Sequence, residues 1–139
     1  MKLITAKLKE DLFTFEATKE ELKVCAKVLH VALKRLGEEF NTRHQDSHES
    51  PYETGMELEK KLTLILEQYK NSTLDDIITI KIRAFEAGII YDAFNEVCNG
   101  LSFGFSTIPT YEQFFDYSRE ELKEFYNRYE KIFLYKFDT

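Results

Sequence analysis

The chain has 139 residues, of which 43% are hydrophobic and 32% charged, and its formal net charge at pH 7 is −6. This balance excludes a disordered chain, and the length suits a single domain that needs no metal or disulfide to stabilise its core. An acidic chain without a basic run is not expected to bind DNA or RNA directly, because phosphate contacts supply most non-specific affinity.

A β-hairpin is predicted over residues 2–8 and 12–17, with Glu10 and Asp11 in the turn. The second run alternates with the period of a half-buried strand. Its apolar side chains on one side are Phe13, Phe15 and Ala17.

The first helix is predicted to begin after Thr18, because Thr18 and Glu21 have the spacing of a capping box. It ends at Leu36, and Gly37 is placed for a carboxy-terminal cap. Its apolar face comprises Leu22, Cys25, Leu29, Ala32, Leu33 and Leu36. Residues 37–50 are polar apart from Phe40, which predicts a surface loop pinned by one aromatic side chain.

Ser50, Pro51 and Glu53 predict the start of a second helix that runs to about Tyr69. The side chains that we expect this helix to bury are Tyr52, Met56, Leu62, Ile65, Leu66 and Tyr69. A β-branched run from Leu74 to Ile82 then predicts a third strand. Its apolar face is Ile78, Ile80 and Ile82.

A third helix is predicted to end near Cys98, with apolar positions at Phe85, Ile89, Ile90, Ala93, Phe94 and Val97. Gly88 weakens this helix by roughly 1 kcal/mol relative to Ala, which favours close packing at Gly88 or a shifted boundary. The aromatic loop 99–118 is expected to fold back over the core. Ser118 and Glu121 predict a last capped helix, whose apolar face is Leu122, Phe125, Tyr126, Tyr129 and Phe133. Residues 133–138 are expected to fray or to add a short strand.

These elements predict one α+β domain over residues 1–139, in which a small antiparallel sheet, a hairpin plus a third strand, packs against about four helices. A strand-helix-loop-helix order occurs twice, and the corresponding segments stand roughly 65 to 68 residues apart. This spacing is consistent with a duplicated unit and half-repeats 1–72 and 73–139.

No window approaches 18 uncharged apolar residues, so we expect no membrane span. The start of the chain, MKLITAKLKE, returns to charge too early for a signal peptide. Cys25 and Cys98 lie in helical patterns beside apolar faces, and we expect buried, reduced thiols in a cytoplasmic protein. A disulfide between them would require their helices to pack side by side in an oxidising compartment.

His44 and His48 have a spacing that can bind a divalent metal on a helix, but they precede the helix start and lack a third ligand. We therefore expect a solvated loop there. His30 and Cys25 lie on different sides of one helix, which disfavours a nucleophile pair and favours packing of His30 at the edge of the core. The sequence has no nucleophile-elbow, phosphate-loop or CxxC motif. We predict no enzymatic activity, no cofactor and no metal site.

The remaining signal is a surface for another protein. Two loops, 38–49 and 112–118, are acidic, and the second also carries aromatic residues. Such a surface would suit a basic partner, with aromatic anchors near its centre. The alternative is that these aromatic side chains only close the core beneath the last helix. The candidate partner-binding residues are Glu38, Glu39, Asp46, Glu49, Glu112, Asp116 and Tyr117.

The segments ALKRLGEEFNTRHQDS and YDAFNEVCNG, in this order of elements, resemble small bacterial immunity proteins encoded beside polymorphic toxins, including those of contact-dependent growth inhibition systems. The residue matches lie in EFNTR (39–43) and NEVCNG (95–100). The second half has EQFFDYS where the first has EFNTRHQ, so a role of Arg43 does not transfer to both halves.

The resemblance implies a protein that binds its cognate toxin domain in the cytoplasm and blocks the active site or substrate entry. Many such toxins are basic nucleases, to which an acidic inhibitor is complementary. Two alternatives remain open. One is a dimeric structural or regulatory module, in which the aromatic carboxy-terminal region makes the homodimer interface. The other is a small metal-dependent enzyme that uses His44 and His48.

Overall fold

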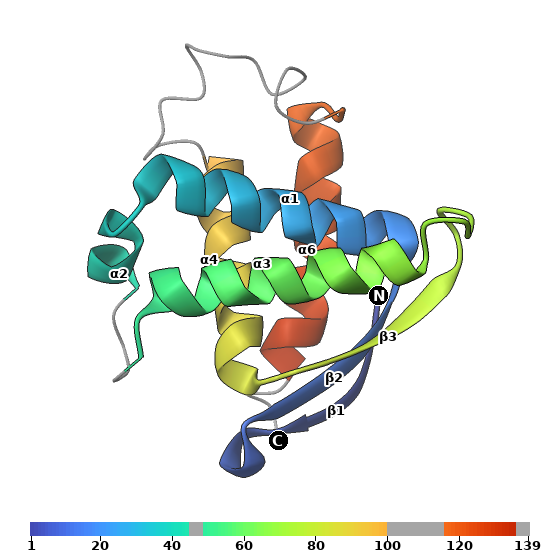
Figure 1. Cartoon of the computed structure of the whole chain (residues 1–139), viewed down its shortest axis with the longest axis horizontal. Coiled ribbons are helices and arrows are strands. Elements are labelled where there is room, and N and C mark those ends of the chain that lie inside the picture. The colour runs from blue at the N-terminus through green and yellow to red at the C-terminus, as the bar shows by residue number, and fades with distance from the viewer. Residues whose placement is uncertain (45–48, 100–115, 136–139) are drawn as a thin grey trace.

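The computed structural model describes residues 1–44, 49–99 and 116–135. In this part of the chain a three-stranded antiparallel sheet, in the order β1-β2-β3, packs against four main helices (Figure 1), which confirms the predicted α+β fold. The elements are β1 (Lys2–Lys7), a short 3₁₀ helix (Leu8–Glu10), β2 (Leu12–Thr18), α1 (Lys19–Leu36), α2 (Glu39–Arg43), α3 (Pro51–Gln68), β3 (Ile77–Ile82), α4 (Ala84–Asn99) and α6 (Arg119–Tyr135).

The central strand β2 confirms the predicted alternation. Phe13 lies opposite Ile82 of β3, Phe15 lies opposite Ile80, and both phenylalanine side chains are fully buried. Asp11 closes the hairpin in a left-handed conformation, with φ 51°. An acidic residue can take the place of glycine there, because its short polar side chain tolerates this conformation better than bulky side chains do.

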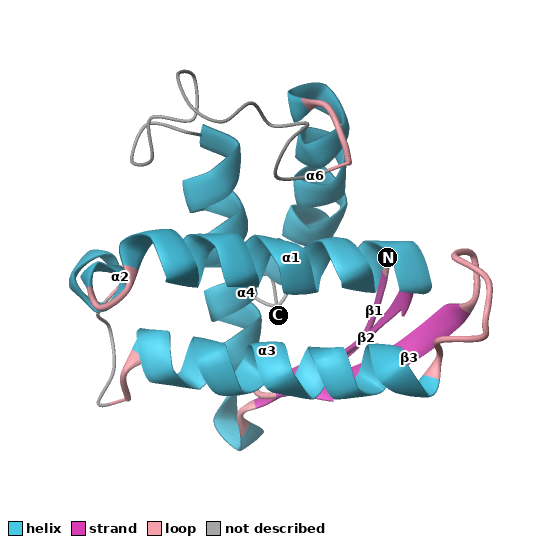
Figure 2. Cartoon of the chain, turned by 45° about the horizontal axis from the view of Figure 1, so that its top comes forward, coloured by secondary structure: helices cyan, strands magenta, loops and turns pink. Residues whose placement is uncertain are grey.

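The helices form two antiparallel pairs that cross each other. The helices α1 and α3 lie side by side, and α4 and α6 form a second pair that runs crosswise behind the first (Figures 1 and 2). The sheet packs at one end of this arrangement, where Phe13 lies 6.4 Å from Phe133 of α6 between ring centroids. The order β2-α1-α3 thus returns as β3-α4-α6, with α2 placed within the loop of the first unit.

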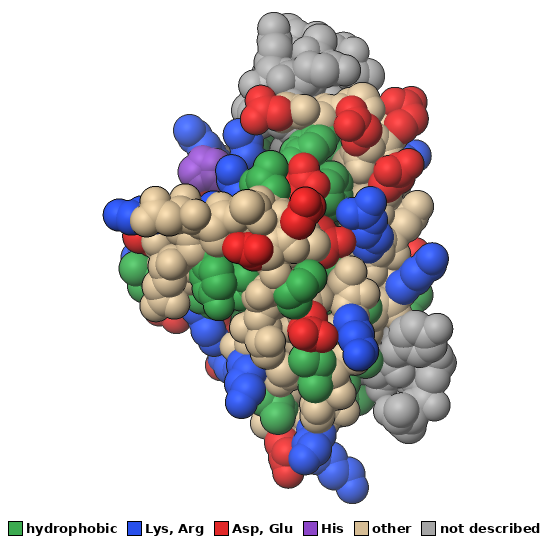
Figure 3. Space-filling model, turned by 90° about the vertical axis from the view of Figure 1, so that its right-hand side faces the viewer, with side chains coloured by type: hydrophobic (Ala, Val, Ile, Leu, Met, Phe, Trp, Pro, Cys, Tyr) green, Lys and Arg blue, Asp and Glu red, His purple; other side chains and the backbone are tan. Residues whose placement is uncertain are grey.

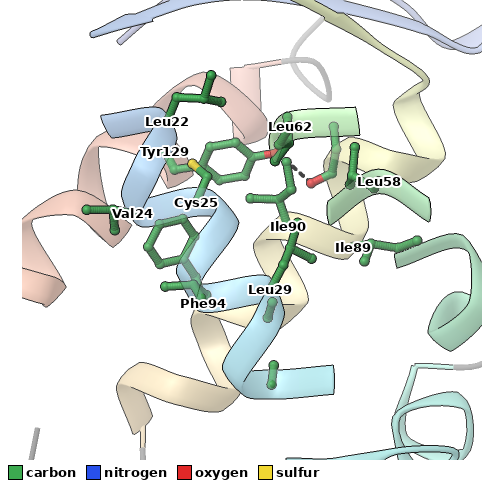
Figure 4. Close-up of a cluster of buried hydrophobic side chains, with 14 of the residues drawn as sticks. Leu22, Val24, Cys25, Leu29, Leu58, Leu62, Ile89, Ile90, Phe94 and Tyr129 are labelled. Carbon is green, nitrogen blue, oxygen red and sulfur yellow. Dashed lines mark hydrogen bonds between the residues drawn. The ribbon is translucent and has the colours of Figure 1, made fainter. Parts of the chain in front are cut away.

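The core lies where the four helices meet (Figure 4). Side chains from α1, α3, α4 and α6 converge there, and Tyr129 of α6 is fully buried among them. Its hydroxyl donates a hydrogen bond to the carbonyl oxygen of Ala87 at 2.6 Å. A buried tyrosine needs such an acceptor, because an unpaired hydroxyl in an apolar core is costly.

The predicted helix starts are confirmed. The Thr18 hydroxyl accepts from the Glu21 backbone N–H, and the Glu21 carboxylate accepts from the Thr18 N–H. The same reciprocal pair joins Ser118 and Glu121 at the start of α6. The Ser50 side chain accepts from the Glu53 N–H. Three sequence-local hydrogen-bond patterns therefore fix where three of the main helices begin.

The burial predicted for α3 is partly wrong. Met56 is 40% exposed, whereas Leu58 and Leu62 are fully buried. Gly55 lies on the buried side, so the inward face of α3 follows the spacing of Gly55, Leu58 and Leu62. The prediction placed Met56 inward because its spacing to Tyr52 also fits a helical face, and packing against α1 and α4 decides between the two faces.

Residues 37–50 also differ from the predicted loop. Five of them form α2, and Phe40 is fully buried, so the expected aromatic pin is correct but it belongs to a helical turn. The expected return of loop 99–118 over the core falls largely on residues 100–115, outside the described residues. Residues 133–135 continue α6, and the remainder of the expected terminal strand also lies outside the described residues.

Two glycines within helices give a matched test of packing. A Cβ at Gly55 would lie 3.0 Å from Leu33 Cδ1 and 3.3 Å from Ile89 Cγ2, whereas a Cβ at Gly88 would meet Phe133 at an ordinary 3.8 Å. The close packing expected at Gly88 is therefore found at Gly55. We expect Gly88→Ala to raise the free energy of unfolding by about 0.5–1 kcal/mol, since it improves helix propensity.

Gly55→Ala gains the same propensity but crowds Leu33, and we expect it to be neutral or to lower the free energy of unfolding by about 1 kcal/mol. Urea denaturation of both variants, with m-values checked for constancy, measures the difference. A larger stabilisation from Gly55→Ala than from Gly88→Ala would contradict the packing described for α3.

Candidate functional site

Glu38 and Glu39 lie at the start of α2 and are exposed. Glu39 accepts from Arg43 Nη2 at 3.2 Å, and Arg43 also lies 3.5 Å from the carboxylate of Glu96 on α4. Arg43, which belongs to the EFNTR segment, therefore joins α2 to α4. Glu39 takes part in an intramolecular ion pair with Arg43, and the Glu38 carboxylate is exposed at the surface.

Glu49 takes part in an intramolecular ion pair with Arg83. Its carboxylate lies 2.6 Å from Arg83 Nη2, and Arg83 Nε donates to Asp11 at 2.8 Å. Asp11 also accepts from the Phe85 backbone N–H. The Arg83 guanidinium, at the β3–α4 junction, thus contacts both the hairpin turn and Glu49, which lies two residues before α3. Its hydrogen bonds to Glu49 and Asp11 raise the pKa of Arg83. Asp46 and Glu112 lie outside the described residues.

Asp116 and Tyr117 lie just before α6 and beside α1. The Tyr117 hydroxyl donates to Glu20 Oε2 at 3.0 Å, and its ring meets Phe125 edge-on with 5.2 Å between centroids. Burial and the Glu20 carboxylate raise the pKa of Tyr117 to about 12, so the phenol stays protonated. Asp116 is exposed. These two residues and the first half of α1 surround a cavity of about 280 Å³, lined by Lys23, Val24, Lys27, Asp116 and Tyr117.

Those predicted site residues that the structure describes therefore do not form one surface. Glu38 and Glu39 follow the carboxyl end of α1, whereas Asp116 and Tyr117 pack beside its first half (Figure 1). Glu49 belongs to the Arg83 network. Sequence proximity grouped Glu38, Glu39 and Glu49 in one acidic loop, and the fold distributes them over separate contacts.

A second cavity, of about 270 Å³, lies between the ends of α2 and α6 and the first half of α4. Its polar lining is His44 and Asp92, with 3.5 Å between His44 Nδ1 and the Asp92 carboxylate. The His44 ring also packs on Phe40 at 4.6 Å between centroids. The prediction of a solvated His44 is wrong, because its side chain is only 13% exposed. The rest of the cavity lining is Pro51, Ala84, Phe85, Gly88, Ile89 and Phe133.

Within the described ranges no group of three His, Cys, Asp or Glu side chains is arranged to hold a metal ion. His48 lies outside those ranges. His30 is exposed, against the prediction of packing at the core edge, and its Nδ1 lies 2.6 Å from Glu59. Cys25 is fully buried, so it does not pair with His30.

Both cysteines are free and buried, as predicted. Burial raises the pKa of Cys25 far above its ordinary value, and burial raises the pKa of Cys98 to about 12. Neither thiol forms an appreciable amount of thiolate near neutral pH, and the thiolate is the reactive form.

One charged feature was missed at the sequence level. Four exposed side chains follow each other along the outer face of α1 at intervals of four, three and four residues. We call this feature the basic stripe, and it comprises Lys23, Lys27, His30 and Lys34. Figure 3 shows Lys and Arg side chains beside a histidine at one edge of the face it draws. The helical spacing of these residues was the available signal, and the negative net charge hid it.

Comparison with models of known protein families, with curated proteins and with solved structures finds no match to this chain. None of the helices in the described ranges is both long and apolar enough to cross a membrane. The residues of the chain itself are therefore the basis for a functional proposal.

The Arg83 network predicts a pH-dependent contribution to stability. Burial alone would raise the pKa of Asp11, but the Arg83 hydrogen bond and the Phe85 N–H outweigh it and lower the pKa. A lowered folded-state pKa stabilises the fold above the unfolded value of about 3.9, and this stabilisation is lost as pH falls through the folded value. We expect Asp11→Asn, which suits the left-handed turn, to cost at most about 1 kcal/mol at pH 7.

Denaturation of Asp11→Asn and the unchanged protein at pH 7 and at pH 3 or below measures this effect. The difference in free energy of unfolding should shrink at acid pH. Glu10→Gln is the control, because Glu10 is exposed in the same hairpin and its ion pair within the described chain is a long one, 3.8 Å from Lys7 Nζ to the Glu10 carboxylate. An equal loss for both variants, or a loss that persists unchanged in acid, would contradict the role given to Asp11.

The buried thiols predict low reactivity. In the native protein at pH 8 we expect Cys25 and Cys98 to react with a disulfide reagent at least about 100-fold more slowly than in denaturant, because both are buried and protonated. Absorbance gives the rate, and mass spectrometry of the labelled peptides assigns each thiol. A native thiol that reacts as fast as in the unfolded chain would show that its helix position is exposed.

Proposed function

We propose that this chain is a cytoplasmic immunity protein that binds a cognate toxin domain and blocks its active site or substrate entry. The resemblance in EFNTR and NEVCNG suggests this class, and the net charge of −6 suits a basic toxin such as a nuclease. The observation that carries the proposal is the combination of Tyr117 with exposed carboxylates at the start of α6. Those carboxylates are Asp116, Glu120, Glu121 and Glu124.

The position of Tyr117 supports a role as an anchor. Its hydroxyl is held by Glu20 and its ring by Phe125, so binding would lose little side-chain entropy. Aromatic anchors at the centre of an interface commonly provide much of its affinity. In the face that Figure 3 draws, Asp and Glu side chains gather over the upper part, toward the start of α6. Carboxylates around an anchor would attract a basic partner and speed the encounter.

Binding is favoured over catalysis by the state of the reactive side chains. Cys25 and Cys98 are buried and burial raises the pKa of both thiols, so neither offers a reactive thiolate. Inhibition would then proceed by occlusion: the acidic start of α6 would occupy the basic cleft in which the toxin holds its substrate, and the Tyr117 ring would exclude water from the contact. No covalent step is required.

The test uses the domain encoded by the reading frame next to the gene for this chain. We expect that domain to be toxic when expressed alone, and its activity to be lost when this chain is added in equimolar amount. Isothermal titration calorimetry should show an affinity that falls as the salt concentration rises, because salt screens the attraction between opposite charges. Absence of binding to that domain would overturn the proposal.

Charge reversal locates the surface. We expect the double variant Asp116→Lys and Glu124→Lys to weaken the complex by about tenfold or more, because it replaces attraction with repulsion. Glu38→Lys with Glu39→Lys tests the α2 surface in the same way. Glu57→Lys with Glu67→Lys, on the exposed face of α3, is the matched control, and thermal unfolding checks the fold of each. Equal affinities for all three would exclude both predicted surfaces.

A further inference from the structure

The basic stripe is not explained by the stability of α1. Its members are neighbours at spacings of three and four residues, so each adjacent pair of like charges is mildly destabilising. From Lys23 to Lys34 the stripe spans about 16 Å at 1.5 Å per residue. His30 adds a positive charge when it is protonated, and Glu59 lies beside it.

The lysines of the stripe also differ from the arginines that hold the fold together. Arg43, Arg83 and Arg128 each lie within 4.0 Å of a carboxylate. Among the described residues, no such ion pair is made by Lys23, Lys27 or Lys34, although the chain as a whole is acidic. Three of the four members of the stripe therefore carry positive charge that no carboxylate of the described residues neutralises in an ion pair, and the fourth, His30, has Glu59 beside it.

The second unit of the fold gives an internal comparison. The helix α4 follows β3 as α1 follows β2, and both helices have a glutamate at the third position that accepts from the backbone N–H of the residue before the helix. At the positions of α4 that correspond to the basic stripe, 65 residues later, there is no cation. These positions hold Gly88, Asp92, Asn95 and Asn99. The architecture of the unit does not require positive charge there.

A concave seat adjoins one end of the stripe. The cavity of about 280 Å³ beside Tyr117 has Lys23 and Lys27 in its lining, together with the apolar Val24. Two ammonium groups one helical turn apart can both approach one carboxylate placed between them, while the Val24 and Tyr117 side chains contact its methylene groups.

We propose that the basic stripe and this cavity bind an acidic helix of the partner protein, with one carboxylate side chain seated between Lys23 and Lys27. The inference rests on the proposed function, and it adds a second contact to the acidic surface at the start of α6. Carboxylates placed on a helix at intervals of four, three and four residues lie on one face of that helix. A partner helix with this spacing, lying along α1, can therefore place one carboxylate opposite each member of the stripe.

A nucleic acid fits this surface less well. Glu59 lies beside His30 within the stripe, and Asp116 and Glu20 lie around its end. A polyanion carries no positive group to set against these carboxylates, and the net charge of −6 repels it at long range. A protein helix can place a Lys or Arg opposite each one, which favours a protein partner.

The first experiment uses a labelled 14-residue alanine-rich peptide as the probe. Its glutamates stand at positions 1, 5, 8 and 12, and a second peptide has the same composition with glutamates distributed around the helix. Fluorescence anisotropy at low salt should show the matched peptide binding about tenfold more tightly, because only its carboxylates face the stripe together. Equal binding of the two peptides would overturn the inference, and so would tighter binding of a 12-nucleotide oligothymidine, which would assign the stripe to nucleic acid.

The second experiment reverses charge within the stripe. Lys27→Glu is expected to weaken binding of the matched peptide by about tenfold. Lys60→Glu, at an exposed position of α3, is the control with the same charge change. The same variants are then titrated against the neighbouring-frame domain. A weaker complex with Lys27→Glu than with Lys60→Glu supports the inference. Equal affinities of the two variants for the domain would reject the inference while leaving the proposed function intact. Failure of the unchanged protein to bind the domain would reject the proposed function itself.

Discussion

The fold depends on the position of one side chain, Tyr129. Its ring lies 6.0 Å from Phe15 of the sheet, edge-on, and 5.7 Å from Phe94 of α4, stacked. Its hydroxyl donates to the Ala87 carbonyl, so one residue makes an apolar and a polar contact between α6 and α4. Since the sheet, α4 and α6 all meet at this ring, the crossing of the two helical pairs and the position of the sheet are set together.

Much of the fold could be predicted because its signals are local. The Thr18–Glu21 and Ser118–Glu121 caps and the alternation around Phe13 depend on residues only a few positions apart. The error at Met56 shows the limit. Two faces of α3 have acceptable spacing, and the choice is made by Leu33 and Ile89, which approach Gly55 from other helices. Gly55 within a helix was the signal for the inward face, because a residue without a Cβ permits that approach.

The candidate site was less predictable, because charge acts through neighbours distant in sequence. Glu39 and Glu49 looked equivalent in one acidic loop, yet Glu49 pairs with Arg83, 34 residues away. Asp116 and Tyr117 acquire their setting from Glu20 and the lysines of α1, nearly a hundred residues earlier. The helical spacing of the four basic-stripe residues was visible in the sequence. The net charge of the whole chain is negative, however, and a net charge does not show where positive side chains lie together.

The two units of the fold share their element order and differ in charge. A helix follows β2 and another follows β3. The third residue of each helix, Glu21 or Glu86, is buried and accepts a hydrogen bond from the backbone N–H of the residue before the helix. Such carboxylates support the helix start in both units, so they belong to the architecture. Of these two helices, α1 has cations at the four stripe positions, whereas α4 has Gly88, Asp92, Asn95 and Asn99 at the corresponding positions. The positive charge of α1 is therefore not required by the order of elements and costs some helix stability, which supports the proposed role of α1 and the adjoining start of α6 in recognition.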